Sequence, residues 1–122
     1  MPKYIEKIEK LTLPVLAIKG TVAFPSVTLS FELSDDICIR AAEAAFATGS
    51  PVLVCAAKHL DDESLTPDSL FRVGTVSRIK QSVKTPEGNM RVITEGFSRA
   101  TVTEFRSFAD YIAADAIARH SP

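Results

Sequence analysis

The sequence lacks tryptophan and holds only two cysteines and two histidines among its 122 residues. It contains no apolar run near the roughly 18 residues that a membrane-spanning helix needs, and its N-terminus has no apolar segment typical of a secretory signal. Cys38 and Cys55 both lie among apolar neighbours, which indicates buried free thiols rather than a disulfide. We therefore expect a cytoplasmic protein that makes no contact with a membrane.

Motifs of the common enzyme classes are also missing. The sequence has no GxxxxGKS/T phosphate-binding loop, no GxGxxG dinucleotide motif and no GxSxG nucleophile motif. His59 and His120 lie far apart and no CxxC pair accompanies them, so the histidines do not indicate a metal site. Cys38 follows two aspartates, a setting that opposes a reactive thiolate with His59 as its base. We expect no catalytic residue, no cofactor site and no metal site in this chain.

The charge is nearly balanced, with a formal net charge of −1 at pH 7. Proteins that bind nucleic acid over a broad surface are usually strongly basic, so we expect no nucleic-acid partner. Basic residues do outnumber acidic ones between Arg72 and Arg106, and an RNA-binding barrel could combine such a strip with stacking aromatic side chains. The phenylalanines of this region stand mostly at the ends of expected strands, where core packing explains them. An RNA- or ligand-binding role stays as the alternative function.

The hydropathy pattern divides the chain into a short lead and one domain. Ile5 and Ile8 have helical spacing and Glu6 and Lys10 form a favourable pair, but a helix this short is marginal in water. We expect residues 1–10 to form a flexible or weakly helical lead and residues 11–122 to form the domain. A chain of 122 residues is long enough for one hydrophobic core.

Alternating and continuous apolar patterns predict strands along most of the domain. Side chains alternate between apolar and polar from Val27 to Leu33, the clearest strand pattern in the chain. The run from Val52 to Ala57 is apolar on both faces and predicts a central strand. The expected strands are residues 12–18, 27–33, 52–57, 71–84 and 90–104. Residues 85–89 form a turn between the last two, and residues 111–118 fit a strand or a helix.

One helix is expected within this series of strands. Residues 35–48 are rich in alanine, follow a capping hydroxyl at Ser34 and end before Gly49. Gly74 and Gly96 interrupt the long strands and predict bulges or sharp bends that let the sheet curl. The sequence therefore predicts an α+β fold, a small curved antiparallel β pseudo-barrel of about six strands with one alanine-rich helix.

Four segments of the chain share the order and spacing of segments in a known family. They are LPVLAIKGTVAFPSVTLSFEL from Leu13, TPDSLFRVGTV from Thr66, the turn Pro86–Gly88, and EGFSRA from Glu95. Together they resemble the N-terminal domains of the Lon protease family over about residues 11–118. Lon enzymes are ATP-dependent serine proteases whose ATPase and peptidase domains have no counterpart in this chain.

This resemblance implies a PUA-like pseudo-barrel that recognises substrates and catalyses nothing by itself. Such a domain would capture unfolded or misfolded proteins by their apolar segments, for degradation by the rest of a Lon-type protease. ATP and magnesium would bind in the ATPase domain, outside this chain. Because Lon forms a hexameric ring, the resemblance also implies self-association. The alternative is a stand-alone PUA-like domain that binds RNA or another ligand.

The candidate substrate-binding surface is the loop that precedes the alternating strand, with the residues Phe24, Pro25, Val27 and Leu29. A proline-stiffened loop can hold a side chain outward at low entropic cost, and an exposed apolar patch is the usual mark of a protein-binding site. Two alternatives remain at this point. Phe24 could close one end of the barrel, and substrates could instead be bound by β-strand addition at an open sheet edge.

Overall fold

The computed structural model describes residues 7–19, 23–58, 67–107 and 110–120. The elements, in chain order, are β1 (Lys7–Ile18), β2 (Thr28–Leu33), α1 (Asp36–Thr48), β3 (Val52–Ala57), the 3-10 turn η1 (Pro67–Ser69), β4 (Leu70–Lys84), β5 (Met90–Ser107) and β6 (Ile112–His120). This order confirms the expected strands, helix and hairpin. It also resolves residues 111–118, which belong almost entirely to the strand β6.

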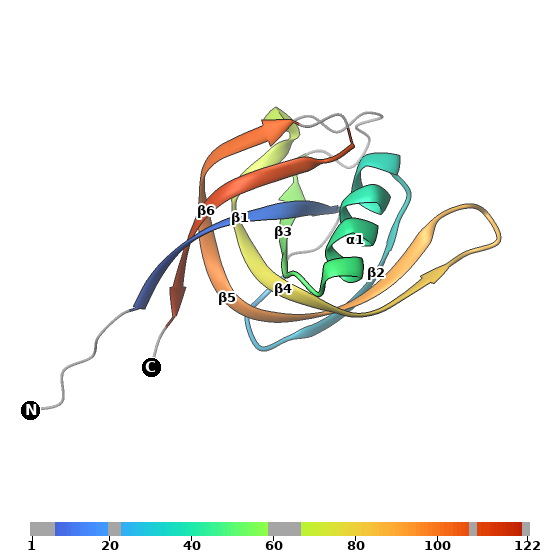
Figure 1. The fold of residues 1–122 in the computed structure, drawn as a ribbon, viewed down its shortest axis with the longest axis horizontal. Helices are drawn as coiled ribbons and strands as arrows, with labels where there is room; N and C mark the ends of the chain where they lie inside the picture. The colour runs from blue at the N-terminus through green and yellow to red at the C-terminus, as the bar shows by residue number, and fades with distance from the viewer. Residues whose placement is uncertain (1–6, 20–22, 59–66, 108–109, 121–122) are drawn as a thin grey trace, which may run out of the picture.

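The six strands form one sheet that curls into a near-barrel (Figure 1). Their order is β2-β5-β4-β3-β1-β6, and an additional pairing of β5 with β6 closes the ring. In the described part of the chain, β2 pairs only with β5, outside this ring. The predicted α+β pseudo-barrel with one helix is therefore confirmed, with one correction. The β1–β3 pair is parallel, because the chain passes through β2 and α1 before it returns in the direction of β1.

The core lies inside the ring and under α1. Strand β3 has the pattern expected of a central strand, since the side chains of Val52–Cys55 are all buried. The helix places small side chains against the sheet, namely those of Cys38, Ala41, Ala42 and Ala45. These small side chains let the helix lie close to the strands, and its contacts with the sheet are mainly with β1.

The ends of α1 were predicted with unequal success. Gly49 is the C-cap of the helix and has the left-handed conformation, with φ 70°. Backbone N–H groups at this cap donate to the carbonyls of Ala45 and Phe46. Ser34 is not the N-cap, however: Asp35 occupies that position and makes no side-chain cap hydrogen bond. Asp35 instead lies 3.9 Å from the ammonium of Lys19 at the end of β1.

The beginning of the described chain is a strand. Residues 7–14 of β1 pair with β6 from Lys7↔His120 to Pro14↔Ala113, so Lys7–Lys10 form a strand and not the flexible or weakly helical lead expected there. A partner strand that lies more than a hundred residues away in sequence overrides the weak local preference. The partner of β1 changes from β6 to β3 directly after Pro14. Residues 1–6 lie outside the described part, and the boundary between lead and domain stays a prediction.

The long hairpin of β4 and β5 bends where its glycines were expected to act. In the β4–β5 ladder the register shifts between Val76 and Ser77, opposite Gly96. In the β3–β4 ladder it shifts between Cys55 and Ala57, directly after the Cys55↔Gly74 pair. A Cβ atom on Gly74 would lie 2.8 Å from the carbonyl oxygen of Val54.

Within the described ranges, no helix is long and apolar enough to cross a bilayer.

Candidate functional site

The loop with the predicted site residues is held against the bend of β5. The amide of Ser26 donates to the carbonyl of Gly96 at 2.9 Å, and the amide of Gly96 donates to the carbonyl of Val27 at 3.0 Å. The loop itself is a tight turn in which the amide of Val27 donates to the carbonyl of Phe24 at 3.3 Å. Ser26 has a positive φ of 65°. The loop is therefore attached to the barrel through its backbone, which leaves its side chains free to face outward.

The close approach of this loop depends on the absence of a side chain at Gly96. A Cβ atom there would lie 2.5 Å from the carbonyl oxygen of Phe24 and 3.0 Å from Cγ2 of Thr75. On the neighbouring strand, the hydroxyl of Thr75 donates to the carbonyl of Ala23 at 2.9 Å and is itself fully buried under the loop. Gly96 and Thr75 thus position the loop from the two strands of the hairpin.

The four predicted site residues lie together, but they differ in exposure. Phe24 is 52% exposed and Val27 is 44% exposed. Pro25 is half-buried, and Leu29, in β2, packs against the core. The exposure of Phe24 contradicts the alternative that its ring closes the end of the barrel. The surface available to a partner is therefore centred on Phe24 and Val27, and its role in binding stays a prediction.

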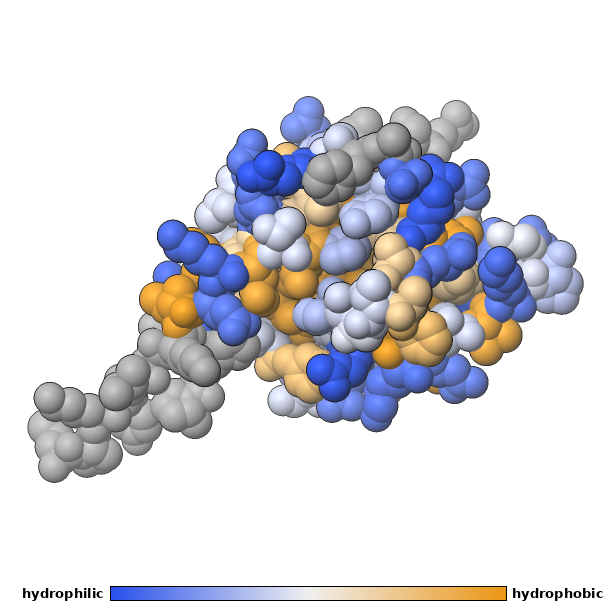
Figure 2. All heavy atoms as spheres, in the orientation of Figure 1, coloured by the Kyte–Doolittle hydropathy of each residue, from blue (hydrophilic) through white to orange (hydrophobic). Residues whose placement is uncertain are grey.

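Sequence reasoning missed the neighbours of this loop. Phe97, next to Gly96, is 47% exposed, so the interpretation of this region's phenylalanines as core residues is wrong for Phe97. The guanidinium carbon of Arg99 lies 5.6 Å from the ring centre of Phe24, and that of Arg78 lies 5.6 Å from the ring centre of Phe97. The Phe97–Arg99 spacing of two residues in a strand places both on one face, a signal that the sequence did contain. On the face drawn in Figure 2, areas of apolar surface (orange) lie among hydrophilic ones (blue).

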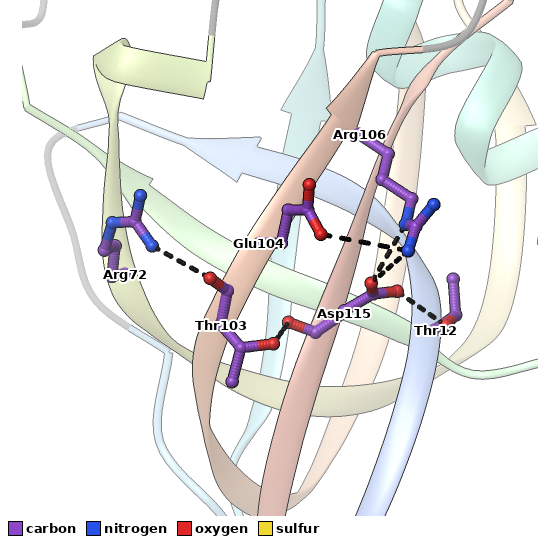
Figure 3. Close-up of polar contacts among 6 residues, drawn as sticks. All are labelled: Thr12, Arg72, Thr103, Glu104, Arg106 and Asp115. Atoms are coloured by element: carbon purple, nitrogen blue, oxygen red, sulfur yellow. Dashed lines mark hydrogen bonds and ion pairs between the residues drawn. The ribbon is translucent and has the colours of Figure 1, made fainter.

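Away from the loop, a group of polar side chains joins the strands that close the barrel (Figure 3). Asp115 in β6 accepts a hydrogen bond from Thr12 in β1 at 2.7 Å and from Nε of Arg106 in β5 at 2.9 Å. Nη2 of Arg106 lies 2.8 Å from the same Asp115 oxygen and 3.8 Å from Glu104. The hydroxyl of Thr103 donates to the backbone carbonyl of Asp115 at 3.1 Å. We call Thr12, Arg106 and Asp115 the strand clasp, since they link β1, β5 and β6.

The strand clasp borders an open hollow of about 400 Å³. Within the clasp, Asp115 and Arg106 shift each other's pKa. Hydrogen bonds from Arg106 and Thr12 lower the pKa of the Asp115 carboxyl below its ordinary value. The hydrogen bond to Asp115 in turn raises the pKa of Arg106. Each partner thus favours the charged form of the other. Because the Asp115 carboxylate and the Arg106 guanidinium are ion-pair partners of each other, we interpret the strand clasp as a structural contact.

The cysteines have the properties of core residues. Burial raises the pKa of Cys38 to about 11 and that of Cys55 to about 12, and both thiols are free. A thiol with a raised pKa holds little thiolate near neutral pH, which opposes a nucleophilic role. His59, the base considered for Cys38, lies outside the described residues. In the described segments, no three His, Cys, Asp or Glu side chains are grouped as a metal site would require.

Comparison with known sequences identifies relatives of the chain. It matches the family described as "ATP-dependent protease La (LON) substrate-binding domain" over residues 12–120. It is 34% identical over 112 residues to a Lon protease of Vibrio parahaemolyticus and 31% identical over 106 residues to a Lon protease of Brevibacillus choshinensis. These alignments cover 92% and 87% of this chain. The chain spans only about 14% of the length of either relative.

Solved structures share the fold. A crystal structure of a Lon N-terminal domain protein from Xanthomonas campestris superposes with a TM-score of 0.65 at 17% identity, covering 89% of this chain and 59% of that chain. The N-terminal domain of a Mycobacterium avium complex Lon protease gives a TM-score of 0.60 at 19% identity, covering 92% of this chain and 54% of that chain. At these identities the likeness concerns the fold alone.

Proposed function

This chain belongs to the family of Lon substrate-binding domains, and from this membership we propose that it captures unfolded protein segments through the Phe24–Val27 loop. The observation that supports this surface is the exposure of two large apolar side chains, Phe24 and Val27, on a loop attached by its backbone to Gly96. Exposed apolar side chains on a rigid support bind apolar segments with little loss of entropy. Contacts of this kind tolerate many sequences, as a recognition domain for unfolded proteins requires.

We further propose that the domain works as part of a larger ATP-dependent protease. The chain spans about 14% of the Lon proteases it matches, so hydrolysis of ATP and of peptides would belong to other parts of such a protein. ATP and magnesium would bind there, and this domain would hold no cofactor. Weak self-association of the domain would accompany assembly of a hexameric parent. The buried free thiols support a cytoplasmic location.

The surface is tested with the double variant Phe24→Ala/Val27→Asp. Binding of a permanently unfolded, fluorescently labelled model protein is measured by anisotropy with the 122-residue chain. We expect the variant to weaken binding by about tenfold, as the loss of two partly exposed apolar contacts would. Circular dichroism and thermal unfolding show whether the barrel is intact.

Matched controls come from apolar side chains elsewhere on the surface. Phe46 on α1 is 49% exposed and Val83 near the hairpin tip is 53% exposed, so Phe46→Ala/Val83→Asp removes a similar apolar area far from the loop. This control is expected to bind like the parent chain. Equal binding by all three proteins would disprove the role of the loop, and salt-sensitive binding of RNA by a chain that ignores unfolded protein would favour the alternative function.

A further inference from the structure

Phenylalanine and arginine side chains alternate around the attachment point of the loop. We call Phe24, Val27, Arg78, Phe97 and Arg99 the Phe–Arg face. Gly96 lies at its centre, because it bonds the loop on one side and precedes Phe97 in the chain. Arg99 lies over the ring of Phe24 and Arg78 lies over the ring of Phe97, each at 5.6 Å. Each half-exposed ring therefore carries a guanidinium group beside it.

These two arginines have rings as neighbours and lack a carboxylate partner in the described part of the chain. Glu95 lies opposite Arg78 in the β4–β5 ladder, but its carboxylate is bound by Lys80 at 2.9 Å. Arg119 of β6 lies opposite Arg99 in the β5–β6 ladder, so the residue paired with Arg99 there brings no carboxylate. The face thus combines apolar rings with an excess of positive charge.

We infer that the Phe–Arg face selects among unfolded segments, favouring those in which a large apolar side chain is flanked by aspartate or glutamate. This inference depends on the proposed function and specifies its substrate class. An apolar side chain would cover the ring of Phe24 or Phe97, while a neighbouring carboxylate accepts hydrogen bonds from Arg99 or Arg78. Lysine or arginine in the flanking positions would be repelled by the same two groups.

The expected selectivity is moderate, because both arginines are at the surface and water screens them. A peptide with acidic flanks gains two surface ion pairs, and one with basic flanks meets two repulsions. Together these effects correspond to about a tenfold difference in affinity between the two peptides.

A single-stranded nucleic acid also carries negative charge and has bases that stack on aromatic rings. The formal net charge of −1 for the whole chain favours a peptide over a polyanion.

The test uses labelled peptides of one length with identical aromatic residues, flanked by glutamate, glutamine or lysine. Anisotropy titrations with the 122-residue chain are expected to rank their affinities as glutamate, then glutamine, then lysine. Raising the ionic strength from about 0.05 M to about 0.3 M should reduce the difference. The variant Arg78→Gln/Arg99→Gln should lower the affinity for the glutamate peptide to that of the glutamine peptide and leave the latter unchanged.

A matched control removes the same charge at the far end of the hairpin. Lys84 and Arg91 are both exposed there, and Lys84→Gln/Arg91→Gln should keep the full preference for the glutamate peptide. Equal affinity for all three peptides would overturn the inference and leave the proposed function intact. Failure of every peptide to bind would overturn the proposed function as well. A single-stranded oligonucleotide that binds this face more tightly than the glutamate peptide would replace the inferred partner by nucleic acid.

Discussion

Replacement of Gly96 by alanine tests how the candidate loop is positioned. The new methyl group would lie 2.5 Å from the carbonyl oxygen of Phe24, about 1 Å inside ordinary van der Waals contact. The obstructing atom belongs to the backbone of the loop, so no rotation of a side chain can relieve the contact. The loop must move away from β5.

The loss of stability follows from the contacts that this movement of the loop breaks. The hydrogen bonds Ser26–Gly96 and Gly96–Val27, at 2.9 and 3.0 Å, each contribute about 0.5–1.5 kcal/mol. Against this, alanine restricts the unfolded chain more than glycine does and stabilises the fold by about 0.4–1 kcal/mol. The lost bonds outweigh this gain. We expect Gly96→Ala to lower the free energy of unfolding by about 1–2 kcal/mol, equivalent to about 4–8 °C in melting temperature.

Urea unfolding measures this change, and hydrogen exchange of the Ser26 amide reports on the loop directly. The matched variant is Gly74→Ala, whose methyl group would lie 2.8 Å from the carbonyl of Val54 in the β3–β4 ladder. It should also reduce stability, yet leave the Ser26 amide protected. Gly96→Ala should weaken binding of unfolded protein as well. A Gly96→Ala chain with unchanged stability and unchanged Ser26 exchange would refute the argument.

Two further predictions concern ionisable groups. Because burial raises the pKa of Cys38 to about 11 and that of Cys55 to about 12, both thiols should react slowly with a thiol reagent at pH 8 in the folded chain and quickly in urea; rapid labelling without urea would show that they are accessible. The lowered pKa of Asp115 means that its contribution to stability is complete above the unfolded pKa near 3.9 and is lost as the pH falls through the lower folded value. Asp115→Asn should therefore unfold with a weaker acid dependence than the parent chain, and parallel stability curves for the two proteins would contradict a role for the strand clasp.

Local patterns in the sequence determined most of the secondary structure. Alternation from Val27 to Leu33, the apolar run from Val52 and the alanine-rich segment before Gly49 each act over a few residues. Such patterns can be interpreted without knowledge of a partner, since burial of one face and the termination of a helix are local requirements. The alternating segment and the glycines of the hairpin also lie in the segments that carried the family resemblance.

Contacts between distant segments were decided only by the tertiary structure. Residues 7–10 become a strand because β6 pairs with them, and Thr12 reaches Asp115 across 103 residues of sequence. The candidate loop was located from sequence, but its attachment to Gly96 and the arginines over Phe24 and Phe97 were not. A residue's own sequence neighbourhood specifies its preference for helix or strand, whereas strand register and the curl of the sheet decide which side chains meet on the outer surface. For that reason the sequence established the fold class and the family, and the folded barrel established the composition of the surface.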